Sequence, residues 1–241
     1  MTKNFYIGIT GGYCRSINTY KIRLLCTELC GYYPYSTGNG YNIGIKSEYT
    51  LSKGSIFNFS VSTELLYEVL SSEVTKEGGE YYDTCGNIYP PKRIATQGRL
   101  EITYSQISWD LLFQIALTNI GIGLCVGPNL SIPTNKNKKE FYEIVNPEGA
   151  IFSRCMLDDL KAMGVNYMYE NDRRLIIIDS NNPNYNNIRI GLTYGLYYNI
   201  DLGFMKIEPW IFYDHAFTKL SDKYDWYIYN FKAGMSILFL L

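Results

Sequence analysis

Residues 57–69 read FNFSVSTELLYEV, and large or apolar side chains occupy every second position apart from Thr63. The intervening positions are mostly polar and include the carboxylates Glu64 and Glu68. A period of two is typical of a β-strand, because successive side chains of a strand point to opposite faces. The segment therefore predicts a strand with one face in apolar surroundings and the other face in polar surroundings.

The same alternation recurs in seven other segments, so the sequence predicts eight strands in one domain spanning 1–241. With 24 tyrosines, 21 glycines and only 19% charged residues, the composition also favours an all-β protein. The eight segments are 5–13, 41–49, 57–69, 107–117, 120–132, 188–200, 205–213 and 227–241.

The distribution of charge between the two faces predicts which one points inward. The apolar faces hold 50 positions without a single charged residue, whereas the 42 opposite positions hold nine charged residues and nine glycines. The inside of a narrow barrel has room for small side chains, while a water-soluble barrel carries its charges outside. We therefore expect a closed, antiparallel, eight-stranded transmembrane β-barrel whose apolar face contacts lipid.

The connections between the predicted strands alternate in length, as in outer-membrane barrels with long external loops and short periplasmic turns. Ten strands are the alternative, if hairpins in the second and third long loops continue the wall. The long connections are 14–40, 70–106, 133–187 and 214–226, and the short ones are 50–56, 118–119 and 201–204.

The nine charged residues of the polar faces are expected to form a buried network of ion pairs that plugs the lumen. Four are basic and five acidic, and buried charges must pair because an unpaired one costs several kcal/mol. The alternative is a path for protons or ions. Inward glycines, among them Gly123, are interpreted as space for opposing side chains. The nine residues are Lys46, Glu48, Glu64, Glu68, Asp110, Arg189, Lys206, Glu208 and Lys232.

Other features of the composition narrow the possible functions. A net charge of −1 argues against a nucleic-acid partner. A single histidine and the lack of paired CxxC motifs argue against a metal site, and no catalytic or cofactor-binding residue is predicted. Five of the six cysteines, Cys14 included, are expected in loops and Cys125 in the lumen. Cys26 and Cys30 are spaced for a possible disulfide in the first loop.

The third long loop contains an insertion at about 153–179 with its own structure. Ser153 is a helix cap, an amphipathic helix follows to residue 163, and Gly164 ends it. A hairpin is predicted next. The insertion is either a ligand-binding cap or only a cover for the barrel mouth. The strands of the hairpin are Val165–Tyr169 and Arg174–Ile178.

The strand pattern resembles the bacterial outer-membrane β-barrel family, namely its small OmpA/OmpX-type members. The C-terminal strand is similar to the signal read by the barrel-insertion machinery, with matching residues at Lys232, Gly234, Ile237 and Phe239. The resemblance implies an outer-membrane location, although Leu240 and Leu241 extend past the usual terminal aromatic. Because residues 1–5 lack a signal peptide, we expect a missing or cleaved N-terminal segment.

The predicted function is non-enzymatic: a structural or surface-interaction protein whose partners are membrane lipid and an envelope or external protein or ligand at the loops. Three rivals remain. A lipid-modifying enzyme would use His215, which follows Asp214; a small porin-like channel would conduct ions; a soluble lipocalin-like binder would pack its apolar face inside.

Overall fold

The computed structural model describes residues 5–23, 32–83, 92–178, 186–221 and 225–241. Eight strands form a ring in which each is hydrogen-bonded to two antiparallel neighbours, in the order β4-β3-β2-β1-β11-β10-β8-β5, with β5 returning to β4. The expected eight-strand arrangement is confirmed. The strands are β1 (Phe5–Arg23), β2 (Tyr32–Lys53), β3 (Phe57–Asp83), β4 (Lys92–Leu117), β5 (Ile122–Asn146), β8 (Arg189–Tyr198), β10 (Met205–Ala216) and β11 (Tyr227–Leu240).

The ten-strand alternative is wrong. The hairpin of β6 (Tyr167–Asn171) and β7 (Arg174–Ile177) pairs with β5 outside the ring, through Glu140 to Glu143. The remaining strand, β9 (Ile200–Asp201), only extends the pairing of β10.

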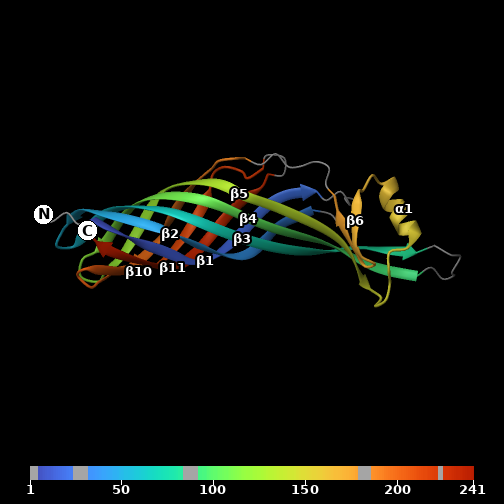
Figure 1. The fold of residues 1–241 in the computed structure, drawn as a ribbon, viewed down its shortest axis with the longest axis horizontal. Coiled ribbons are helices and arrows are strands. Elements are labelled where there is room, and N and C mark those ends of the chain that lie inside the picture. Colours follow the sequence, from blue (N-terminus) through green and yellow to red (C-terminus); the bar gives the residue numbers. More distant parts are fainter. Residues whose placement is uncertain (1–4, 24–31, 84–91, 179–185, 222–224) are drawn as a thin grey trace.

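The two ends of the molecule differ (Figure 1). The short connections at 54–56, 118–121 and 202–204 lie at the end where β1 begins and β11 finishes, with Tyr6 opposite Leu240. We call this the turn end. The helix and the hairpin lie at the opposite end, which we call the cap end.

Two of the predicted long loops, 14–40 and 70–106, are largely strand, and β5 extends into a third, which corrects the expected boundaries. β3 has 27 residues and β4 has 26, and both run far beyond the wall of the ring. They pair with each other as far as Asp83 and Lys92. The outward face of these extensions is polar. Strand ends predicted from an apolar outer face therefore fall too early in the chain.

The apolar face of the ring points outward. Phe59, Trp109 and Ile190 expose 45%, 45% and 49% of their surface, whereas Glu64 and Lys232 expose 1% and 0%. This confirms the inverted arrangement and contradicts the water-soluble binder, which needs the apolar side chains inside. Such an extent of exposed apolar surface on a ring is expected only where something apolar covers it.

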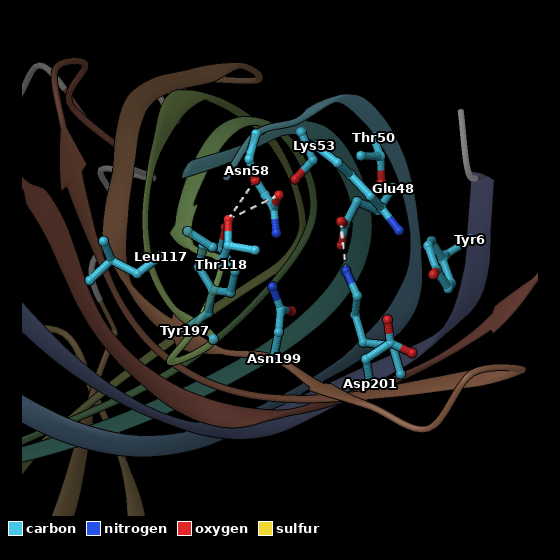
Figure 2. Close-up of a pocket in the computed structure, with 15 residues that line it drawn as sticks. Tyr6, Glu48, Thr50, Lys53, Asn58, Leu117, Thr118, Tyr197, Asn199 and Asp201 are labelled. Atoms are coloured by element: carbon cyan, nitrogen blue, oxygen red, sulfur yellow. Dashed lines mark hydrogen bonds and ion pairs between the residues drawn. The ribbon is translucent and has the colours of Figure 1, made fainter. Parts of the chain in front are cut away.

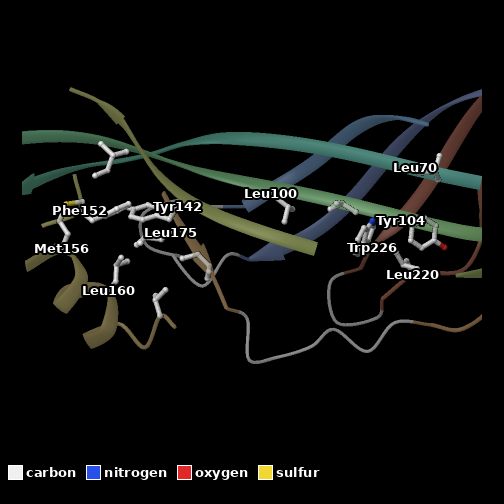
Figure 3. Close-up of a cluster of buried hydrophobic side chains, with 14 of the residues drawn as sticks. Leu70, Leu100, Tyr104, Tyr142, Phe152, Met156, Leu160, Leu175, Leu220 and Trp226 are labelled. Carbon is white, nitrogen blue, oxygen red and sulfur yellow. The ribbon is translucent and has the colours of Figure 1, made fainter. Parts of the chain in front are cut away.

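Beyond the ring, β3, β4, β5, β7 and β6 continue as an open sheet, and α1 (Arg154–Ala162) packs on it. Ser153 Oγ accepts a hydrogen bond from the Met156 backbone N–H, and Gly164 adopts a φ of 77° after the last turn, as the residue types predict. Figure 3 shows Met156 and Leu160 of α1 directed toward Tyr142 and Leu175 of the sheet. No helix in the described ranges is long and apolar enough to cross a membrane.

Candidate functional site

The strongest candidate for a functional feature is the charged interior of the ring. All nine residues predicted for the lumen are buried, with at most 6% of their surface exposed. They come from β2, β3, β4, β8, β10 and β11, so several of the pairs between them cross the interior.

Lys46 ties one wall of the ring to another near its middle. Its Nζ lies 3.1 Å from Glu64 Oε1 on the adjacent strand β3, and it also donates a hydrogen bond to Glu208 of β10. All three side chains are fully buried. The ammonium compensates two buried carboxylates, and its removal would leave both of them without a cation.

Lys232 is the centre of a second cluster. Its Nζ lies 2.8 Å from Asp214 Oδ2, 3.2 Å from Glu68 Oε1 and 3.5 Å from Asp110 Oδ2. Asp214 was not predicted to lie inside, because the predicted seventh strand ends at 213. The alternation of β10 continues to Ala216, and this parity places Asp214 inside together with Lys206 and Glu208.

Arg189 pairs with neutral oxygens instead of a carboxylate. Its guanidinium donates to Gln106 Oε1 at 2.7 Å and to the backbone carbonyl of Ile228 at 2.8 Å. Gln106 in turn donates to Glu68, the partner of Lys232. The arginine is therefore joined to the second cluster through an amide, a link that charge counting alone does not predict.

Apolar rings and glycines fill the space that the charges leave. Trp210 stacks on Phe212 with ring centroids 4.7 Å apart, and both are buried in the interior. A Cβ added to Gly123 would lie 2.3 Å from the Tyr197 ring, and one added to Gly234 would lie 2.6 Å from Trp210. Gly123 and Gly234 therefore make room for large side chains, as predicted, whereas a Cβ added to Gly8 or Gly44 would first meet backbone atoms of the neighbouring strand.

A polar cavity of about 300 Å³ opens at the turn end (Figure 2). Glu48, Asn58 and Asn199 lie around it, and Lys206 Nζ pairs with Glu48 Oε1 at 2.7 Å. Lys206 also lies 4.9 Å from the ring centre of Tyr6. Two of its four charged lining residues, Lys206 and Glu48, pair with each other, and the other two are Lys53 and Asp201.

The cap end has ion pairs of its own. Arg174 lies 3.2 Å from Glu170 and also pairs with Glu143 of β5, which joins the hairpin to the sheet. Burial acts to lower the pKa of the Arg174 guanidinium, but the bonds to Glu170 and Glu143 outweigh it and raise that pKa above its ordinary value. The hairpin is thereby held to β5 by a permanently charged side chain.

Asp214 and His215 face opposite sides of the wall. Asp214 points inside toward Lys232, while the His215 ring lies among aromatic rings of the outer face, 5.3 Å from Tyr229 and 5.5 Å from Phe217. Adjacent residues of a strand cannot work as one acid–base pair in such a geometry. No group of His, Cys, Asp and Glu in the described ranges is arranged to hold a metal ion.

The cysteines differ in part from expectation. Cys14 was expected in a loop, but β1 is longer than predicted and its thiol is fully buried, with Asn42 Nδ2 at 3.1 Å. Cys125 lies inside the ring as predicted. Cys155 of α1 is disulfide-bonded. The possible Cys26–Cys30 disulfide lies outside the described residues.

The residues of the predicted assembly signal lie on both faces of the last strand. Lys232 is buried inside, whereas Phe239 is 47% exposed on the outer face. β11 pairs with β1 and with β10 over its length, so this strand joins the chain ends. Recognition by the insertion machinery stays a prediction.

Comparison with known proteins adds little. No known protein family matches the chain, and no curated protein matches it. A crystal structure of Ail, the attachment invasion locus protein of Yersinia pestis, in complex with the heparin analogue sucrose octasulfate, aligns with 98% of this chain and 99% of that chain at 10% sequence identity, with a TM-score of 0.29. A likeness of that size says nothing about what this chain binds, so its function has to come from its own residues.

Proposed function

We propose that the chain is an integral outer-membrane β-barrel protein with a plugged lumen, which acts at the cell surface through the sheet and helix of its cap end. The observation that carries the proposal is the inverted ring: exposed apolar side chains outside and buried ion pairs inside. A ring of hydrogen-bonded strands satisfies every backbone group without water, which is the requirement for strands in lipid.

The buried clusters support a structural interior. Lys46 and Lys232 are both fully buried and between them bind five carboxylates from β3, β4 and β10. A water-filled pore of the porin type needs a wider ring than eight strands. We therefore expect no steady conductance in single-channel recordings from planar bilayers, and a stable open level would favour the small-channel rival.

The cap end supports a role in surface contacts. Its sheet and helix have a buried apolar core and an exposed edge at β6, where Met168 and Tyr169 expose 55% and 56% of their surface. The disulfide of Cys155 requires an oxidising compartment, which agrees with a location outside the cytosol. The contact partner is expected to be an envelope or external protein or ligand.

The deciding experiment expresses the chain behind a secretory signal and follows it in cell fractions. We expect it in the outer-membrane fraction, and we expect the unboiled protein to run faster than the boiled protein on a denaturing gel. Recovery of folded chain in the supernatant without detergent would overturn the membrane assignment. Surface labelling of an added tag in the β6–β7 turn then tests which end faces outward.

The lipid-modifying enzyme remains a rival only through His215. Replacing His215 with Ala should leave the lipid composition of cells unchanged, because its ring contacts are aromatic side chains of the outer face. Loss of a chain-dependent lipid product in this variant would favour the enzyme.

A further inference from the structure

A cavity of about 380 Å³ lies between α1 and the strands of the cap end, apart from the charged interior of the ring. Met156 and Leu160 of the helix and Met163, which follows it, form one side, and Tyr81 and Tyr142 of the sheet form the other. Met156 and Leu160 are buried, while Met163 is half exposed, so the cavity opens to solvent at its rim. Figure 3 shows the helix side chains directed toward Tyr142.

One charged group belongs to this cavity, the carboxylate of Asp159. Tyr81 Oη donates to its Oδ2 at 2.6 Å, so the phenol orients the carboxylate. The tyrosine faces are electron-rich and attract cations. Asp159, Leu160 and Ala162 of the lining belong to the C-terminal half of α1, where the helix dipole places partial negative charge. All three features favour a positive charge at the rim.

The two cations of α1 do not neutralise this site. Arg154 pairs with Asp158 at 3.9 Å on the exposed side of the helix, and Lys161 Nζ lies 6.0 Å from the ring centre of Tyr167. The walls are apolar, and ligand cavities of this size bind mostly through apolar contact with a few placed polar groups.

We propose that this cavity binds a small organic ammonium: an aromatic or short alkyl body lies against Met156 and Leu160, and its ammonium binds Asp159 beside the tyrosine rings. The inference does not depend on the membrane assignment, because the site is built entirely from the cap end. The proposed ligand class belongs to the cap end alone and does not involve the ion pairs inside the ring.

The test uses phenethylammonium as the probe, added to the full chain in lipid nanodiscs with ¹³C-labelled methionine methyl groups. We expect saturable shifts at Met156 and Met163 and none at Met235, which lies on the outer face of the ring. The anionic analogue 3-phenylpropionate should not produce them. Equal binding of both compounds, or no saturable shift with the ammonium, would overturn the proposal.

Two variants and one control locate the site. D159N retains an oxygen for Tyr81 and should weaken binding about tenfold, as loss of a charged partner costs roughly 1.5 kcal/mol. A162W, on the rim, should abolish binding by filling the cavity. D158N changes the adjacent carboxylate outside the cavity and should bind within about twofold of the unchanged chain. Equal loss in D158N and D159N would show a general charge effect and would overturn the assignment to this cavity.

Discussion

The two halves of strand β4 keep the same inward and outward phase but reverse their polarity. Near the cap end its inward residues are apolar and its outward residues are charged or polar; within the ring wall the reverse holds. In the half near the cap end, which we call the upper half, the inward residues include Leu100, Ile102 and Tyr104, and the outward residues include Arg99, Glu101 and Thr103. In the half within the ring wall, which we call the lower half, the inward residues include Gln106, Ser108 and Asp110, and the outward residues include Ile107, Trp109 and Phe113.

This reversal indicates two different surroundings along one continuous strand. In the upper half the outward charges pair with each other, with Arg99 Nη2 2.7 Å from Glu101 Oε1 and Nε 3.1 Å from Glu73 Oε1. That is the pattern of a water-exposed sheet with an apolar core. In the lower half the apolar side chains face outward, as they do on the lipid-facing side of a transmembrane barrel. The boundary of the proposed membrane region therefore lies near residues 104–106.

The largest expected effect comes from removing an interior charge. Replacing Lys46 with Met leaves Glu64 and Glu208 buried without their cation, and breaking a buried pair in this way costs about 3–5 kcal/mol. Urea unfolding from lipid vesicles, followed by the gel shift, measures the loss. Lys53, exposed at the turn end, is the control, and its replacement with Met should change stability little. Adding Glu208→Gln to Lys46→Met should recover part of the loss.

The second prediction tests the apolar interior of the upper half. Leu100 is fully buried, so Leu100→Ala should destabilise the cap end by about 2–5 kcal/mol through lost contacts and a cavity. Hydrogen exchange resolved along the chain should show faster exchange in the extensions of β3 and β4 than in the ring wall. Uniformly faster exchange would show that the two halves unfold as one unit.

The third prediction compares one substitution on the same face of both halves. Phe113→Lys places a charge in the proposed lipid-facing region and should cost about 2–4 kcal/mol. Thr103→Lys lies on the same side of β4 in the proposed aqueous region and should change stability by no more than about 0.5 kcal/mol. Folding yields into vesicles and urea midpoints measure both. Equal effects would remove the distinction between the halves.

The smallest expected effect concerns the helix cap. Ser153 accepts the hydrogen bond of the Met156 N–H, and Ser153→Ala should cost about 1 kcal/mol, confined to α1. The same variant should weaken phenethylammonium binding slightly without changing the gel shift of the ring. A change in the gel shift would mean that the helix contributes to the stability of the ring wall.

The sequence predicted the structure best where the two faces of a strand differ strongly in polarity. The outer apolar faces predicted the number of ring strands and the inward position of nine charged residues, because a period of two ties each position to one side of the sheet. Ser153 and Gly164 predicted the bounds of α1 through the backbone geometry that their residue types favour. Asp214 was missed because the predicted strand ended at 213 and β10 continues to Ala216, and Cys14 was assigned to a loop because β1 continues beyond 13 to Arg23.

The sequence by itself determined which side of each strand is apolar, because alternation needs no knowledge of neighbouring strands. Tertiary structure alone decided which charges meet, since Lys46 and Glu208 lie far apart in the chain and come together only across the ring. It also decided how β5 reverses its phase: Thr134 is an extra residue where Ser105 pairs with Asn135 and Gln106 with Pro133. Because one added residue switches the faces of a strand, this bulge lets Ser131 face the polar interior of the ring and lets Tyr142 face the apolar core at the cap end.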